Sequence, residues 1–116
     1  MYKNPKNEKK YRVVGYHDLA EVKKKIKAGQ FVINDDVLND ARLEFGWNKN
    51  DILYAYSKLK PEDCCDTDHS KIKYLMVVDT YEANIRNEDI YTHFYINAGM
   101  VIINSFHKPP KSGRII

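Results

Sequence analysis

Apolar positions early in the chain recur at helical spacing. Leu19, Val22 and Ile26 fall three or four residues apart, which puts them on one face of a helix. Asp18 precedes this stripe as a capping residue, and Gly29 follows it as a residue that readily takes the left-handed conformation found at helix ends. The pattern predicts an amphipathic helix between these two residues.

Two more helices are expected before Pro61. The second begins at Asn34 or Asp35 and ends at Gly46, and its apolar stripe consists of Leu38, Ala41 and Phe45. The third begins at Asn48, and its stripe consists of Ile52, Tyr56 and Leu59. Pro61 ends the helical region because proline lacks an amide proton and crowds the preceding turn.

After residue 69 the hydrophobic pattern changes from helical to strand-like. Residues 71–83, 91–96 and 100–107 are rich in β-branched and aromatic side chains, and turn-like segments separate them. Three consecutive strands with short turns favour an antiparallel meander. The expected architecture is therefore α+β, with three N-terminal helices packed on one face of a sheet of about three strands and the other face available to a ligand.

The expected domain is single and runs from residue 11 to residue 108. Residues 1–10 are polar and basic, and residues 109–116 carry proline and glycine, so both segments are interpreted as tails. The net charge of +3 is too small to identify a nucleic-acid-binding protein by itself. No apolar run is long enough to span a membrane, and the adjacent Cys64 and Cys65 cannot link distant segments, so we expect a cytoplasmic protein.

Candidate chemistry falls on the middle strand of the expected meander. Tyr91, His93 and Tyr95 alternate along it and should share one face. The opposite face, which should meet the helices, carries Ile90, Phe94 and Ile96. Histidine can act as a general acid or base near neutral pH, and tyrosine can donate a proton, accept one or stack on a base.

The position of His107 depends on the register of the last two strands. If the turn after Ile96 pairs that residue with Met100, Tyr91 lies opposite Ser105 and diagonal to His107, on the same face. A change of one residue in this register would turn His107 toward the core. The residue types suit RNA cleavage by the 2′-hydroxyl, which requires no metal. The alternative is that they are ordinary strand aromatics and exposed polar side chains.

Lysines near the strand ends are candidates for phosphate contacts. Lys71 and Lys73 open the first expected strand, and Lys108 follows His107. Lysines at sheet edges also discourage aggregation, so this second interpretation stays open. The segment CCDTDH contains several metal-ligand types but lacks the second ligand pair of a structural zinc site, so we expect Asp66 or Asp68 to shape a loop there. We expect no metal and no small-molecule cofactor.

Several short segments, taken in order, are similar to those of a known toxin family. They span residues 19 to 108 and are LAEVKKKIKAGQ, VLNDARLEFGW, LKPEDC, VVDTY, IYTHFYI and VIINSFHK. In their order and spacing they resemble the MqsR (motility quorum-sensing regulator) family of bacterial toxin ribonucleases. The resemblance implies a RelE-like fold and a metal-independent endoribonuclease, the toxin of a type II toxin–antitoxin system, with messenger RNA as substrate and a cognate antitoxin as partner.

The resemblance also assigns residues. The family's catalytic tyrosine falls on Tyr91 and its late lysine on His107, whose imidazolium can also donate a proton. The family's loop lysine falls near Asp66 and its glutamine on Val78, and neither residue keeps that chemistry. We therefore expect catalysis by Tyr91, His107 and His93. The alternatives are a catalytically degenerate relative that binds RNA or protein, and a domain that binds only protein.

Overall fold

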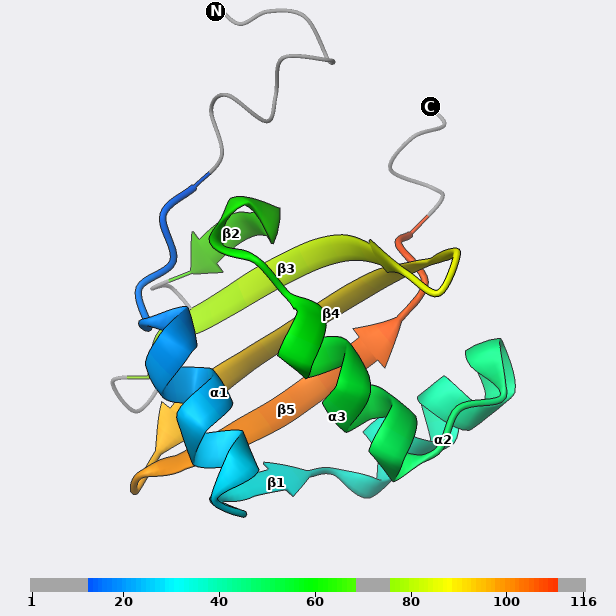
Figure 1. The fold of residues 1–116 in the computed structure, drawn as a ribbon, viewed down its shortest axis with the longest axis horizontal. Helices are drawn as coiled ribbons and strands as arrows, with labels where there is room; N and C mark the ends of the chain where they lie inside the picture. The colour runs from blue at the N-terminus through cyan, green and yellow to red at the C-terminus, as the bar shows by residue number, and fades with distance from the viewer. Residues whose placement is uncertain (1–12, 69–75, 111–116) are drawn as a thin grey trace, which may run out of the picture.

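The computed structural model describes residues 13–68 and 76–110. The first half is helical, with α1 at Leu19–Lys27, α2 at Asp35–Phe45, α3 at Lys49–Lys58 and a short 3-10 turn, η2, at Pro61–Asp63 (Figure 1). The three predicted helices are thus confirmed. Within the described ranges no helix has the length and apolar character needed to cross a bilayer.

The helix ends follow the capping residues predicted from the sequence. The Asp18 carboxylate accepts a hydrogen bond from the backbone N–H of Ala20 at 3.1 Å. Asn48 and Asp51 cap each other, since each backbone N–H donates to the other's side chain, at 2.9 and 3.2 Å. Gly46 ends α2 with a φ of 75°, a conformation that favours glycine.

In the described residues the sheet has five strands, in the order β1-β5-β4-β3-β2. Their bounds are β1 Phe31–Ile33, β2 Cys64–Asp68, β3 Val78–Ile85, β4 Glu88–Asn97 and β5 Met100–His107. β3, β4 and β5 form the expected antiparallel meander, β2 pairs antiparallel with β3, and β1 pairs parallel with β5. The sheet is therefore mixed, and the prediction of about three strands was too low.

The two strands that were missed lie at the sheet edges. β1 has only three residues and lies between two helices, too short for a periodic pattern. β2 is polar, and the prediction that Asp66 or Asp68 shapes a loop was wrong, since both belong to this edge strand. β3 begins at Val78. The first part of the expected strand, residues 71–75, lies outside the described residues.

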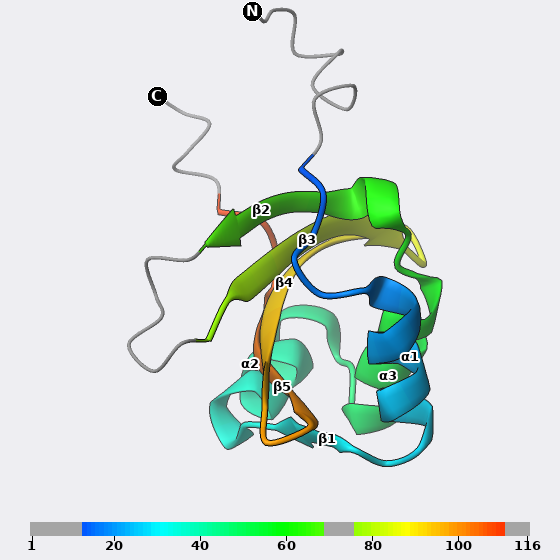
Figure 2. The ribbon, with the colours of Figure 1, turned by 90° about the vertical axis from the view of Figure 1, so that its left-hand side faces the viewer.

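Helices α1 and α3 cover one face of the sheet, and α2 lies beside β5 (Figures 1 and 2). The predicted stripes of α1 and α3 supply much of the core, with Leu19, Val22, Ile52, Tyr56 and Leu59 all buried. The predicted inward side of β4 also holds, with Ile90 and Phe94 buried and Ile96 packed against the core. We call the side of the sheet opposite α1 and α3 the open face.

The turn between β4 and β5 differs from the prediction. Asn97 pairs with Met100, so the loop consists of Ala98 and Gly99 alone, and the expected pairing of Ile96 with Met100 was wrong. Ala98 and Gly99 have φ angles of 52° and 78°. Two-residue hairpin loops adopt such left-handed conformations because they match the twist of the flanking strands.

Candidate functional site

A β-bulge in β5 brings His107 onto the open face. The turn alone would shift the strand by one residue from the expected register and turn His107 inward. Between the pairing of Phe94 and that of His93, however, the register shifts again and leaves Asn104 as an extra residue on β5. The two shifts combine, so His107 lies directly opposite Tyr91 rather than diagonal to it.

The three residues predicted to be catalytic are close together. The rings of Tyr91 and His107 are stacked, with centroids 5.3 Å apart and planes 24° apart. The His93 ring meets Tyr91 edge-on at 6.4 Å. All three side chains are partly exposed. We call Tyr91, His93 and His107 the Tyr91 cluster.

Hydrogen bonds fix which ring nitrogen of each histidine carries a proton. His107 Nδ1 lies 2.7 Å from the carbonyl oxygen of Lys108, and His93 Nδ1 lies 2.7 Å from the amide oxygen of Asn104. Because both oxygens only accept, Nδ1 donates in each contact. The His107 ring therefore offers Nε2 for acid–base chemistry.

Glu82 extends the cluster across the sheet, and it is not among the site residues predicted from the sequence. It lies on β3 directly opposite Tyr91, which is in turn opposite His107, so the three residues form one row over three strands. We call Glu82, Tyr91 and His107 the catalytic row, after the role that we propose for them below. Alternation along β3 could have put Glu82 on the open face, but only the two-residue turn at Arg86 and Asn87 sets it opposite Tyr91.

The surroundings of Tyr91 keep its phenol protonated. Partial burial of the ring raises the pKa of Tyr91. Electrostatic repulsion between a phenolate and the ionised forms of Cys65, Asp66 and Glu82 raises it further. At neutral pH the side chain is therefore a hydrogen-bond donor rather than a phenolate. A neutral donor suits contact with an anionic phosphate.

The lysines predicted to bind RNA do not extend this cluster within the described residues. The backbone N–H of Lys108 donates to the Glu44 carboxylate at 2.8 Å, and its ammonium lies 5.9 Å from the centre of the Phe45 ring. Lys108 therefore lies against α2. Lys71 and Lys73 lie outside the described residues. Strands β2, β3, β4 and β5, as described, contain no Lys or Arg.

The two positions that lack the chemistry implied by the resemblance, Asp66 and Val78, lie on strands β2 and β3. Asp66 is exposed on β2 beside Thr80, and its charge contributes to the raised pKa of Tyr91. Val78 is buried at the start of β3. In residues 13–68 and 76–110 no three His, Cys, Asp or Glu side chains are placed to hold a metal. His69, part of the segment considered for zinc, lies outside these ranges.

Cys65 should react slowly with alkylating reagents although it is exposed. Desolvation, followed by the charges of Glu82, Cys64 and Asp66, raises the pKa of Cys65 to about 12. At pH 8 the fraction of Cys65 present as thiolate is therefore about a thousandfold smaller than for a free cysteine. The greater nucleophilicity of a more basic thiolate restores only part of the lost reaction rate. We expect iodoacetamide to label Cys65 roughly fiftyfold more slowly than a small free thiol, as measured by tandem mass spectrometry.

The variant Glu82→Gln provides the control for this measurement. It removes the largest charge contribution to the raised pKa of Cys65, so labelling should accelerate. Labelling of the unmodified protein at the rate of a free thiol would contradict the electrostatic description of this side of the sheet.

Fold and cluster together define a small α+β protein with a five-stranded mixed sheet and an acid–base cluster on its open face. In comparisons with known proteins, no family model and no curated protein matches this chain. A function for the protein therefore has to be inferred from the chemistry of the cluster and from the resemblance described above.

Proposed function

We propose that the protein is a metal-independent endoribonuclease that cleaves single-stranded messenger RNA, and that it acts as the toxin of a type II toxin–antitoxin system with a RelE-like fold. The observation that carries this proposal is the stacking of Tyr91 on His107 with Glu82 directly across from Tyr91. A carboxylate, a phenol and an imidazole in one row supply a base, a hydrogen-bond donor and an acid.

Glu82 and His107 divide the proton transfers between them. Glu82 takes the proton of the ribose 2′-hydroxyl, and the 2′-oxygen forms a bond to phosphorus. The bond from phosphorus to the 5′-oxygen breaks, and the His107 imidazolium gives its Nε2 proton to that oxygen. The products are a 2′,3′-cyclic phosphate and a 5′-hydroxyl. The backbones of the two residues are two strand spacings apart, about 10 Å, so their side chains reach a phosphate over Tyr91 from both sides.

Tyr91 and His93 support this reaction in different ways. The protonated phenol of Tyr91 donates a hydrogen bond to a non-bridging phosphate oxygen, where charge increases in the transition state. His93 is a positioning residue, since its ring meets Tyr91 edge-on while Asn104 holds its Nδ1. The aromatic faces of this cluster also suit stacking with an unpaired base.

The toxin function requires a partner that silences it, and the sheet edge offers a place for it. Among the described residues, β2 is the last strand in the sheet order and pairs with β3 on one side only. An edge strand of this kind can accept an added strand from a second protein through backbone hydrogen bonds. An antitoxin strand beside β2 would lie next to Asp66 and Cys65, near the catalytic row.

The proposal is tested by incubating the protein with a long unstructured RNA in EDTA and mapping the ends of any fragments. We expect cyclic phosphate ends from the unmodified protein and from Tyr95→Phe, a control on the same strand and face. Tyr91→Phe should cut much more slowly. Intact RNA over the same range of protein concentration would overturn the proposal.

One observation favours a second function, a binding domain without nuclease activity. The described strands β2 to β5 lack Lys and Arg, and Asp66 carries negative charge toward Tyr91. RNA retained at low salt, released steeply as salt increases and never cleaved, would identify an RNA-binding relative. No RNA binding at low salt would identify a domain that binds only protein.

A further inference from the structure

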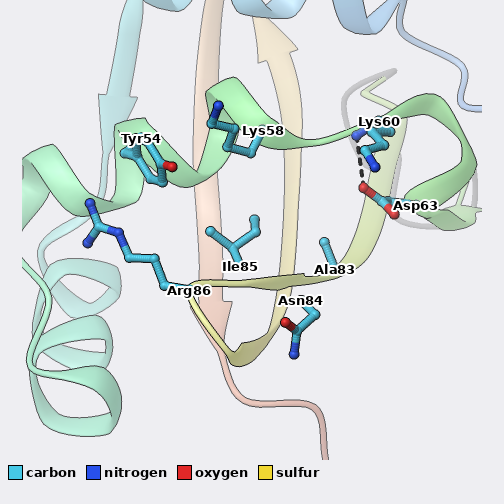
Figure 3. A pocket seen from close by; sticks show the side chains of 8 residues that line it. All are labelled: Tyr54, Lys58, Lys60, Asp63, Ala83, Asn84, Ile85 and Arg86. Atoms are coloured by element: carbon cyan, nitrogen blue, oxygen red, sulfur yellow. Dashed lines mark hydrogen bonds between the residues drawn. The ribbon is translucent and has the colours of Figure 1, made fainter.

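A pocket of about 300 Å³ lies between α3 and the end of β3, away from the open face (Figure 3). Tyr54 and Lys58 line it from α3, and Ala83 and Ile85 form its apolar floor from β3. The side chains of Ala83 and Ile85 point toward α3. Because residues alternate along a strand, Glu82 points to the opposite side of the sheet. The pocket is therefore separate from the catalytic row.

Positive charge is concentrated around this pocket. Lys58, Lys60 and Arg86 line it, against the single carboxylate of Asp63. One oxygen of that carboxylate already accepts the backbone N–H of Lys60 at 2.8 Å. Lys58 Nζ and Arg86 Cζ lie 5.5 and 4.4 Å from the centre of the Tyr54 ring, so two cations share one aromatic side chain. An anion in the pocket would be attracted by both cations.

The Arg86 guanidinium is held in place before any ligand arrives. Its Nη1 forms an ion pair with Asp51 at 2.8 Å, and its carbon lies 4.4 Å from the Tyr54 ring centre and 5.3 Å from that of Trp47. A guanidinium has five N–H donors, so this pair leaves further donors for an anion. Fixing the group in advance reduces the entropy lost on binding.

The backbone at Arg86 supports a role for its side chain. Arg86 and Asn87 form the β3–β4 turn, with φ angles of 56° and 65°. Such turns favour glycine, asparagine or aspartate, and an arginine in this left-handed conformation is strained. Local strain of this kind is concentrated at ligand-binding sites. The contacts of Arg86 with Asp51, Tyr54 and Trp47 offset that strain.

We propose that this pocket binds a phosphate group. Arginine matches the geometry of a phosphate with paired N–H donors, and Lys58 and Lys60 add charge. The inference about its source rests on the proposed function: the phosphate belongs to a single-stranded RNA whose cleaved bond lies at the catalytic row. Arg86 is four residues from Glu82 along β3, about 13 Å, a distance that a few nucleotides span around the turn.

The first arm of the test uses inorganic phosphate and NMR. Phosphate should shift the backbone amide signals of Tyr54, Ala83 and Arg86 in a saturable way, and the double variant Lys58→Gln/Lys60→Gln should weaken this binding about tenfold or more. The matched control is Lys24→Gln/Lys27→Gln, which removes the same charge from exposed positions on α1. Equal weakening in both double variants, or no saturable shift, would overturn the proposal.

The second arm uses RNA and identifies the source of the phosphate. Tyr91→Phe protein binds an unstructured RNA at several salt concentrations, so cleavage does not affect the measurement. Adding Lys58→Gln/Lys60→Gln should reduce the slope of log affinity against log salt by about 0.7 for each phosphate that the protein no longer neutralises. If the double variant leaves the slope unchanged although the protein with both lysines binds inorganic phosphate, the phosphate does not come from RNA. That result would support a small phosphorylated ligand instead.

The two arms also separate this inference from the proposed function. Both measure binding and neither requires RNA cleavage. Phosphate shifts in a protein that leaves RNA intact would support the pocket and overturn the nuclease. RNA cleavage by a protein whose pocket signals do not shift with phosphate would support the nuclease and overturn the phosphate pocket.

Discussion

Replacing His107 by alanine should lower the rate of RNA cleavage by about a hundred- to ten-thousandfold, because the leaving 5′-oxygen would lose its general acid. Glu82→Gln should have an effect of similar size, since an amide cannot take the 2′-hydroxyl proton. The double variant should be little slower than either single variant, because an acid and a base that act in one step are not additive. Single-turnover cleavage of a labelled RNA measures all three rates.

The pH dependence tests the role given to Tyr91. Its phenol donates only while protonated, and burial together with the charges of Cys65, Asp66 and Glu82 raises its pKa. An ordinary tyrosine, with a pKa near 10, begins to lose its proton at alkaline pH. Tyr91 therefore keeps its proton under conditions in which an ordinary tyrosine does not. The ratio of the wild-type rate to the Tyr91→Phe rate should stay constant up to about pH 10. If this ratio already decreases at a pH about one to two units below 10, the result would contradict donation by a neutral phenol.

Two controls keep these results specific. Tyr95→Phe alters the same face of β4 and should cut at the wild-type rate. The unfolding midpoint of each variant in urea should match that of the wild type, since Glu82 is exposed and His107 is partly exposed. If His107→Ala and Glu82→Gln both cleave RNA at the wild-type rate, the catalytic row takes no part in the reaction.

Replacing Asp79 by alanine should destabilise the fold by about 3–5 kcal/mol, because its carboxylate is buried and satisfies several donors. It accepts the backbone N–H groups of Tyr16 and His17 at 3.1 and 2.8 Å and the Thr67 hydroxyl at 2.6 Å. These contacts join β3 to β2 and to the segment before α1. A domain of this kind is stable by roughly 5–15 kcal/mol in total, so much of its stability would be lost.

Urea unfolding followed by circular dichroism measures this effect. Thr67→Val removes one donor and should cost about 1 kcal/mol, which makes it the graded control. The close approach of Gly15 is part of the same contact, because a Cβ atom there would lie 3.0 Å from the Asp79 carboxylate. A loss below about 1 kcal/mol for Asp79→Ala would show that water replaces the carboxylate and that the contact is not needed to hold the segment.

The helices could be predicted from the sequence because their signals are local. The stripe of Ile52, Tyr56 and Leu59 and the reciprocal caps of Asn48 and Asp51 all fall within one helix length. The edge strands gave no such signal. β1 depends on pairing with β5, far away in the sequence, and the polar β2 is a strand only because β3 lies beside it.

The candidate site was predictable only in part, for a related reason. Alternation along β4 put Tyr91 and His93 together without any knowledge of the neighbouring strands. The position of His107 needed the length of a turn and a bulge at Asn104, which has no distinctive sequence pattern. Glu82 needed the register between β3 and β4. Cross-strand neighbours are set by turns and bulges, so a strand pattern alone does not reveal them.

The bulge at Asn104 divides β5 into two segments with opposite phase. Before it the odd-numbered residues Val101 and Ile103 face the core, whereas after it the even-numbered Phe106 does so and His107 faces outward. The length of the hairpin loop and the bulge therefore set the composition of the catalytic row together. A lineage that lengthened or shortened that loop by one residue would keep the row only if β5 also lost or gained an unpaired residue. Paired insertions and deletions, rather than substitutions, would therefore record the history of this site.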